Sequence, residues 1–304
     1  MRKFVVITGG LGNQLFQIAG ALSVTDQFVN VVTCIGKPQL HAGELEVASL
    51  DFQGRVKFTK CKKRHYLSPL AFRAMLSLAI TKRDISDKSL YRKALLLLAG
   101  TIFSAHLRTL VYPRISRGVG YDPKFRETTG NLLIGYFQSH RIQPSARELL
   151  INAFSKFELK HSRPKGNSLE VLIHVRLGDY RSEPTFGVLD SKYFSSALKL
   201  LEKKMPISEI SIFSDEPVDA LKVIPSDYLD RIKVEELAEE SPLVTFCRMR
   251  GYESYVLANS TFSWWAAYTS MPKNVFAPYP WFMNGDNPVE LIPKNWIQVK
   301  SEWE

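Results

Sequence analysis

The sequence predicts an α/β protein of two domains, and three observations support this prediction. The chain begins with a strand-like run at residues 3–8, followed by a glycine-rich turn and a helix-like stretch, which is how an α/β unit starts. Residues 160–168 are polar, contain proline and glycine and lack apolar periodicity, as a linker does. After them the alternation of strands and helices starts again. We therefore expect domains at residues 1–162 and 163–304.

The individual elements follow from hydrophobic patterns. Short aliphatic or β-branched runs predict buried strands, and apolar residues three and four positions apart predict helices. In the first domain we expect strands at residues 3–8, 29–35 and 131–136, and helices at 13–24, 66–111 and 143–157. In the second we expect strands at 171–175, 210–213, 232–234, 255–258 and 274–277, and helices at 192–203, 217–223, 242–251 and from 263 to 270.

The composition indicates a folded protein with an uneven charge. Hydrophobic residues make up 45% of the chain and charged residues 23%, which is typical of globular rather than disordered proteins. The net charge is +10, and residues 55–117 hold 15 Lys or Arg against two Asp. Such a segment suits an anionic partner, such as a nucleic acid, a phosphorylated substrate or an anionic lipid. A solvated basic surface explains it equally well.

Cysteine usage and the N-terminal sequence bear on the compartment. The three cysteines are widely separated and form no CxxC pair, which argues against a structural zinc site and favours a reducing compartment. The N-terminus lacks the apolar core of a secretory signal. The longest apolar run, at residues 94–105, is too short to cross a bilayer. We expect a cytoplasmic protein, with peripheral contact to the inner face of the plasma membrane.

The first segment suited to chemistry is GGLGNQLFQ at residues 9–17. Glycines after a strand allow the backbone to approach a ligand and leave N–H groups free at the start of a helix. The spacing matches neither GxGxxG nor a P-loop. Glycine spacing alone favours a plain turn, whereas the amides of Asn13 and Gln14 favour a contact with sugar hydroxyl groups.

The second segment is HVRLGDY at residues 174–180, directly after a predicted strand. In open α/β sheets, ligands bind beyond the carboxyl ends of the strands. Arg176, with His174 beside it, is therefore placed to form two bonds to a phosphate and to stabilise a departing nucleoside diphosphate. The alternative is a structural salt bridge between Arg176 and Asp179, and spacing does not decide between the two.

The third segment is SIFSDEP at residues 211–217. Ser214 and Asp215 end a predicted strand, where a carboxylate is placed to accept hydrogen bonds from a ribose hydroxyl group or from guanine N–H groups. The alternative is an N-cap for the following helix, because Ser and Asp are favoured there.

The fourth segment, YVLANSTFSWWAAY at residues 255–268, leads from a strand into a helix. Backbone N–H groups and the hydroxyl groups of Ser260, Thr261 and Ser263 suit a pyrophosphate at the helix N-terminus. Trp264 and Trp265 are expected to pack in the core rather than stack on a ligand.

In this order, the four segments resemble the α-1,2-fucosyltransferases of glycosyltransferase family 11, over residues 9–268. The resemblance implies a GT-B-like α/β architecture of two Rossmann-like domains facing across a cleft. Residues 1–162 would form the acceptor side, and residues 163–304 would bind the donor. It also implies GDP-β-L-fucose as the donor, inversion at the anomeric carbon, and neither a metal nor another cofactor. The expected acceptor is a galactoside of a bacterial surface glycan such as an O-antigen, lipid-linked at the membrane.

The resemblance also implies roles for individual residues. Arg176 matches the arginine that binds the donor phosphates, with His174 beside it, and Asp215 matches the acidic group near the nucleoside, preceded by Ser214. Leu177 stands where many members have a second arginine, so we expect less positive charge near the donor. Asp179 is a candidate general base. The remaining matches are the pyrophosphate turn of Ser260, Thr261, Phe262 and Ser263, and the loop facing fucose, with Gly12 and Asn13.

Two other functions compete with this one. The first is transfer from another GDP-sugar, or to a different acceptor or linkage, because one fold supports many donors. The second is an RNA-binding protein, suggested by the basic charge. The basic residues at 55–117 lie away from all four motifs, and the sequence has no RRM, KH or dsRBD signature. We therefore expect no nucleic acid partner.

Overall fold

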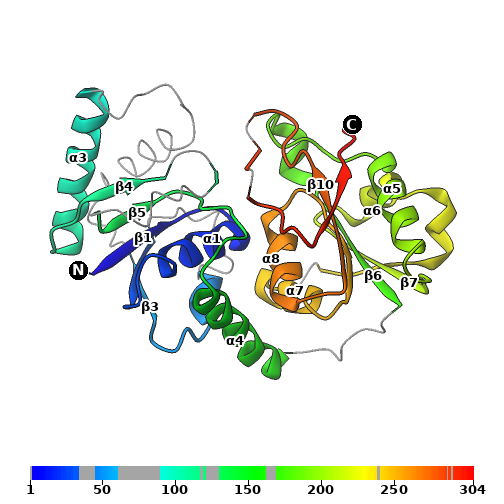
Figure 1. Cartoon of the computed structure of the whole chain (residues 1–304), viewed down its shortest axis with the longest axis horizontal. Helices are drawn as coiled ribbons and strands as arrows, with labels where there is room; N and C mark the ends of the chain where they lie inside the picture. The colour runs from blue at the N-terminus through cyan, green and yellow to red at the C-terminus, as the bar shows by residue number, and fades with distance from the viewer. Residues whose placement is uncertain are drawn as a thin grey trace. The chain divides into compact units, whose positions relative to one another are not determined.

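The computed structural model describes residues 2–33, 45–60, 90–116, 119–120, 130–161, 169–237, 240–285, 287–288 and 290–304. The chain forms two compact units (Figure 1), unit 1 with Met1–Lys156 and Pro288–Leu291, and unit 2 with Phe157–Asn287 and Ile292–Glu304. Each unit has its own parallel sheet, which confirms the α/β, GT-B-like class with two Rossmann-like domains. The division falls inside helix α4 (Pro144–His161), whereas the sequence placed it after residue 162.

Unit 1 is built on a five-stranded parallel sheet with the order β3-β2-β1-β5-β4. The order reverses between β1 and β5, because the chain adds β2 and β3 on one side and β5 and β4 on the other. The predicted strands at 3–8 and 131–136 and the helix at 143–157 are confirmed with small shifts. The elements are β1 (Lys3–Ile7), α1 (Leu11–Leu22), β2 (Val29–Thr33), η2 (Glu46–Ser49), β3 (Val56–Lys60), α3 (Leu90–Leu107), β4 (Pro113–Ile115), β5 (Leu132–Ile134) and α4.

The middle of unit 1 differs most from the sequence prediction. Of the helix expected at residues 66–111, the part at 66–89 lies outside the described residues, and α3 covers Leu90–Leu107. The end of that prediction was wrong, because Arg108 has a φ of 50°, a left-handed conformation that stops the helix. Strands β3 and β4 were not predicted. Lysines interrupt the apolar pattern of β3, and β4 has only three residues.

Unit 2 is built on a six-stranded parallel sheet with the order β8-β7-β6-β9-β10-β11. This is the strand order of a Rossmann fold, and it reverses between β6 and β9. The elements are β6 (Glu170–Val175), η4 (Gly178–Ser182), α5 (Ser191–Glu202), β7 (Glu209–Ser214), α6 (Pro217–Ala220), η5 (Leu221–Val223), η6 (Ser226–Arg231), β8 (Ile232–Val234), α7 (Pro242–Met249), β9 (Ser254–Val256), α8 (Thr261–Ser270), β10 (Asn274–Tyr279) and β11 (Ile297–Lys300).

The predicted strands and helices of unit 2 are confirmed with small shifts, whereas the short 3-10 helices η4 and η6 were not predicted, and two further differences concern α8 and β11. Helix α8 begins at Thr261, two residues before the predicted start, because the Ser260 side chain accepts a hydrogen bond from the backbone of Phe262 and acts as the N-cap. Strand β11 was not predicted, since polar Gln298 and Lys300 alternate with its apolar residues.

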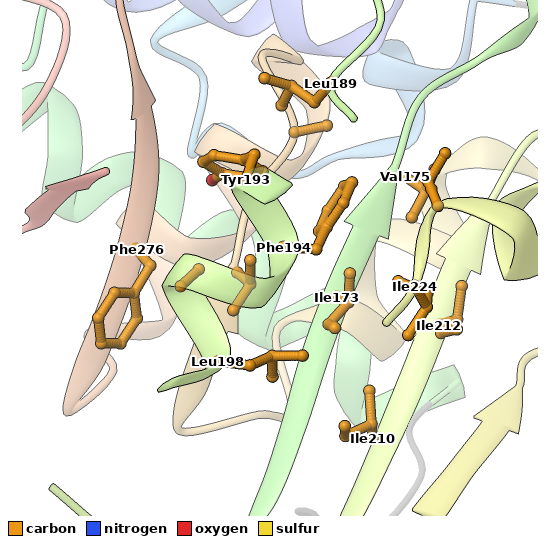
Figure 2. Packing of buried hydrophobic residues seen from close by; sticks show 14 of the residues in the cluster. Ile173, Val175, Leu189, Tyr193, Phe194, Leu198, Ile210, Ile212, Ile224 and Phe276 are labelled. Carbon is orange, nitrogen blue, oxygen red and sulfur yellow. The ribbon is translucent and has the colours of Figure 1, made fainter. Parts of the chain in front are cut away.

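The core of unit 2 fixes which side of β6 faces which helix (Figure 2). Ile173 and Val175 of β6 pack with Phe194 and Leu198 of α5 in one buried cluster. Because side chains alternate along a strand, His174 lies on the opposite face. Trp264 and Trp265 are fully buried, as expected of core residues.

Candidate functional site

The carboxyl ends of β6, β7 and β9 meet at one edge of the unit 2 sheet, which we call the unit 2 edge. The HVRLGDY, SIFSDEP and YVLANSTFSWWAAY segments each span the carboxyl end of one of these three adjacent strands. The structure therefore brings together nine of the predicted site residues: His174, Arg176, Asp179, Ser214, Asp215, Ser260, Thr261, Phe262 and Ser263. The edge includes the point between β6 and β9 where the strand order reverses, and ligands of open α/β sheets bind at such points.

Arg176 is the first residue after β6, and two carboxylates hold its guanidinium group. One nitrogen lies 2.7 Å from Asp179 Oδ1 and another lies 3.2 Å from Asp215 Oδ2. The guanidinium carbon lies 5.6 Å from the centre of the Tyr180 ring. Both sequence alternatives for Arg176 therefore meet here, since the salt bridge with Asp179 exists at the place where a ligand would bind.

Asp215 contacts both the side chain of Arg176 and the backbone of the next residue, and so holds Arg176 in orientation. Its Oδ1 accepts a hydrogen bond of 3.1 Å from the backbone N–H of Leu177, while Oδ2 pairs with Arg176. Gly178 makes room for this arrangement, because a Cβ atom at that position would collide with Asp215 Oδ2. Leu177 is fully buried in the core, so in this chain position 177 presents no side chain at the unit 2 edge.

Ser214 and Asp215 do not cap the following helix. The N-cap of α6 is Glu216, and its own side chain makes no capping bond within the described residues. Ser214 is buried at the end of β7, where its Oγ accepts a 3.1 Å hydrogen bond from the backbone N–H of Glu216. This bond fixes the turn that carries Asp215.

His174 is buried and uncharged at neutral pH. Its ring centre lies 6.4 Å from that of Phe262, and within the described residues its Nδ1 has no hydrogen-bond partner. Burial, and then the positive charge of Arg176, lower the pKa of His174 from 6.5 to about 3. Because it carries no charge at neutral pH, His174 does not supply a second cation for a phosphate.

The turn after β9 is fixed by internal hydrogen bonds. The Ser260 side chain accepts from Phe262 N at 3.3 Å, and the fully buried Ser263 donates to Ser260 O at 3.2 Å. The hydroxyl group of Tyr180 donates to Asn259 O at 3.2 Å and so ties the turn to the segment after β6. Thr261 is half-buried in the first turn of α8. The pyrophosphate role of this turn stays a prediction.

Three residues that position the site were not singled out from the sequence. Gly178 admits Asp215, Tyr180 links two strand ends, and Asn259 donates a 2.8 Å hydrogen bond to Phe186 O. All three lie inside the motifs that the sequence analysis identified, so the motifs already pointed to this part of the chain. Their contacts join segments that are distant in sequence, which spacing alone does not reveal.

Gly12 and Asn13 lie in unit 1, at the carboxyl ends of β1 and β5, which we call the unit 1 edge. Gly12 is buried in the first turn of α1. Asn13 Oδ1 accepts a hydrogen bond of 3.1 Å from Gln138 Nε2. Since Asn13 follows β1 and Gln138 follows β5, this bond spans the point where the strand order of unit 1 reverses. Within the described residues, Gln14 Oε1 and Gln138 Oε1 are buried without hydrogen-bond partners.

The described residues contain no group of three or more His, Cys, Asp or Glu side chains arranged to hold a metal ion. Among the described helices, none combines the length and the apolarity that crossing a membrane requires.

The comparison with known proteins decides the family. The profile of Glycosyl transferase family 11 matches residues 4–300. The chain belongs to this family. This family 11 glycosyltransferase is 25% identical over 320 residues to the O-antigen biosynthesis glycosyltransferase WbnK of Escherichia coli, with 96% of the chain and 99% of that protein covered. It is 24% identical over 183 residues to an Escherichia coli alpha-1,2-colitosyltransferase, covering 55% of the chain and 62% of that protein.

Among solved structures, the family 11 glycosyltransferase is similar to the NodZ alpha-1,6-fucosyltransferase soaked with GDP-fucose. The TM-score is 0.46 and the sequence identity 12%, with 95% of this chain and all of the NodZ chain covered.

Proposed function

We propose that this family 11 glycosyltransferase is an inverting α-1,2-fucosyltransferase, a galactoside 2-α-L-fucosyltransferase. It would move L-fucose from GDP-β-L-fucose to a hydroxyl group of a galactoside in a bacterial surface glycan. The observation that carries this proposal is the position of Arg176 at the point where the strand order of unit 2 reverses. A guanidinium group beside the N-terminus of α8 suits a pyrophosphate.

The two carboxylates on Arg176 differ in a way that suggests how the donor binds. The Asp179 side chain is 63% exposed, whereas that of Asp215 is 24% exposed and also bonded to Leu177 N. We infer that a donor phosphate replaces Asp179 on the guanidinium group while Asp215 keeps Arg176 in orientation. As the bond between the anomeric carbon and the phosphate oxygen breaks, negative charge grows on GDP, and Arg176 stabilises it.

The acceptor hydroxyl group attacks the anomeric carbon from the opposite side and loses its proton. Asp179 stays the candidate for the general base, because a donor phosphate on Arg176 would release its carboxylate. His174 is not suited to this role, because its Nδ1 is buried and its pKa is low.

The unit 1 edge supports a sugar rather than a phosphate ligand. Asn13 and Gln138 are neutral amides, and the buried oxygens of Gln14 and Gln138 are acceptors that fit sugar hydroxyl groups. A second donor has specific support, because one relative is an alpha-1,2-colitosyltransferase. Colitose is fucose without one hydroxyl group, so GDP-colitose is the alternative donor.

We propose that the reaction needs no metal ion. Arg176 and the N-terminus of α8 would provide the positive charge that a divalent ion supplies in other transferases. Activity should therefore change less than about twofold in excess EDTA, since the leaving group keeps its stabilisation. Initial rates with and without EDTA, after dialysis against chelator, check this. A loss that Mg²⁺ or Mn²⁺ restores would contradict it.

The test of the function is incubation of the purified protein with GDP-fucose and an array of β-galactosides, followed by linkage analysis of the product. We expect an α-1,2-linked fucose on galactose, and product formation at least about a hundredfold slower with Arg176→Ala. GDP-colitose and GDP-mannose, tested in competition, decide the donor. A product with another linkage, or preference for another donor, would replace the proposal by the corresponding transferase. A cytoplasmic location with a lipid-linked O-antigen acceptor, and hence peripheral membrane contact, belongs to the same proposal.

A further inference from the structure

The two sides of helix α3 in unit 1 differ sharply. One side packs into the core through Ala99 and Phe103, which are buried against Phe4 and Leu132. The other side exposes large apolar residues to solvent, with Leu90, Leu97 and Leu98 at 82%, 74% and 56% exposure. Figure 1 shows α3 beside β4, at one side of the unit 1 sheet. Single exposed leucines are ordinary, but a contiguous exposed patch indicates a binding surface.

The exposed residues are contiguous because they follow helical spacing. Leu90, Ala94, Leu97, Leu98, Thr101 and Ala105 are all exposed and lie three or four positions apart on one face. Even the one hydroxyl group on this face is used internally, because Thr101 Oγ1 donates to Leu97 O at 2.9 Å. The face therefore offers few polar groups to water.

Two further large apolar residues are exposed in the segment after the helix. Leu110 and Tyr112 are 65% and 53% exposed. The Asn131 side chain holds their backbone, donating to Leu110 O at 3.2 Å and accepting from Tyr112 N at 2.6 Å. These contacts fix the two side chains outside the core. We call the six helical residues together with Leu110 and Tyr112 the α3 face.

The charge around the α3 face has one sign. Residues 90–116 include four Lys or Arg and no Asp or Glu. Lys93 and Arg108 are exposed next to the leucines. An apolar stripe flanked by basic residues and free of acidic ones matches the interfacial region of an anionic bilayer, with acyl chains next to negative headgroups.

We propose that the α3 face docks this protein on an anionic lipid bilayer. The proposal rests on the proposed function, because a lipid-linked acceptor lies at such a surface. Charge complementarity favours a bilayer over a second copy of the chain, since two α3 faces would bring basic residues against basic residues. It also favours a bilayer over RNA, because a phosphate backbone would leave the leucines exposed to water.

The test is sedimentation of the full-length protein with vesicles of phosphatidylcholine alone or with about 30% phosphatidylglycerol. We expect binding to the anionic vesicles, reduced at least tenfold by Leu97→Glu and about threefold by Lys93→Glu. The matched control is Leu229→Glu, which places the same charge at a leucine of η6 that is 50% exposed. This control should bind like wild type.

The proposal would be overturned if the wild type bound no vesicles, or if Leu97→Glu and Leu229→Glu lost vesicle binding equally. It would also be overturned by a wild-type dimer in sedimentation velocity that Leu97→Glu dissociates. The fourth contrary outcome is RNA binding that Leu97→Glu leaves intact, together with absent vesicle binding. Transfer to a soluble galactoside is measured in parallel. Leu97→Glu should retain this transfer activity, because the α3 face is not part of the proposed active site. A wild-type protein that binds vesicles but transfers no fucose would refute the proposed function and leave the docking surface standing.

Discussion

The two units place their predicted site residues at equivalent positions but fill those positions with different chemistry. In each unit the strand order reverses beside the first strand, between β1 and β5 or between β6 and β9. At the unit 1 edge the contact across this point is the amide bond between Asn13 and Gln138. At the unit 2 edge the strand ends carry the charged group of Arg176, Asp179 and Asp215.

This difference between neutral amides and charged groups indicates which part of a sugar nucleotide each edge suits. A guanidinium group favours phosphate, because its charge and its forked geometry match two phosphate oxygens. Neutral amides favour sugar hydroxyl groups, which need donors and acceptors but no charge. Under the proposed function, removing charge from unit 2 should therefore affect catalysis and GDP binding, whereas removing an amide from unit 1 should affect only the recognition of the sugar.

The largest effect is expected from Arg176→Ala. Losing a preorganised donor to the developing charge lowers turnover on the order of 10²–10³-fold. Arg176→Lys should remain severely impaired, because a single ammonium group does not replace the fork. Turnover with GDP-fucose, after circular dichroism has confirmed the fold, measures both effects.

The control for Arg176 is Arg231→Ala. Arg231 also pairs with a carboxylate, Glu202, at 3.2 Å, but it lies before β8 and away from the unit 2 edge. This variant should keep wild-type turnover. If folded Arg176→Ala retained more than about a tenth of wild-type turnover, the salt bridge with Asp179 would be only structural.

Much of this site was predictable from the sequence, because a short stretch of residues is enough to recognise where a strand ends. The runs before Arg176, Asp215 and Ser260 indicate strands, and parallel strands bring their carboxyl ends to one edge. The contact of Asp215 with Leu177 N was not predictable, since it joins residues 38 positions apart. Nor was the burial of His174, because periodicity does not say which helix covers that face of β6.

The next largest effect concerns the pH dependence of stability. The pKa of His174 is about 3 in the folded protein, because the ring is buried, and 6.5 in an exposed imidazole, so only the unfolded chain gains a proton between these values. Stability is therefore lost as the pH falls below 6.5, by about 1.4 kcal/mol per pH unit. Between pH 7.5 and 5 this amounts to about 2 kcal/mol of the free energy of unfolding.

Denaturant unfolding of the full chain at several pH values checks this expectation. In His174→Gln, the free energy of unfolding should no longer fall by the amount due to His174 as the pH is lowered. His140→Gln, in unit 1, should show the same fall as the wild type. An unchanged pH dependence in His174→Gln would show that the ring is accessible to protons in the folded state.

A smaller effect is expected from the two carboxylates of unit 2, in opposite directions. Asp215→Asn keeps an acceptor for Leu177 N but loses the charge that orients Arg176, so turnover should fall about tenfold. Asp179→Asn removes the group that the donor displaces, so the affinity for GDP should rise about threefold. Calorimetric titration with GDP, together with turnover, measures both.

Each outcome also separates alternatives for these residues. If Asp215 instead reads the nucleoside, Asp215→Asn would reduce the preference for GDP over ADP and UDP. If Asp179 is the general base, Asp179→Asn would lose turnover at least a hundredfold, whatever its affinity for GDP.

The smallest effect should come from Asn13→Ala in unit 1, and it tests the comparison most directly. Gln138 loses its partner, and one amide that is available to a sugar disappears. A single neutral hydrogen bond contributes about 0.5–1.5 kcal/mol, so the affinity for GDP-fucose should fall roughly threefold to tenfold. The affinity for GDP should stay unchanged, because GDP has no sugar beyond the phosphates for this edge to contact.

Titrating wild type and variant with GDP and GDP-fucose measures the difference, with Asn30→Ala, on the neighbouring strand β2, as the control. Equal weakening for both ligands would mean that Asn13 supports the phosphates or the fold, and the division of roles between the two edges would then be wrong.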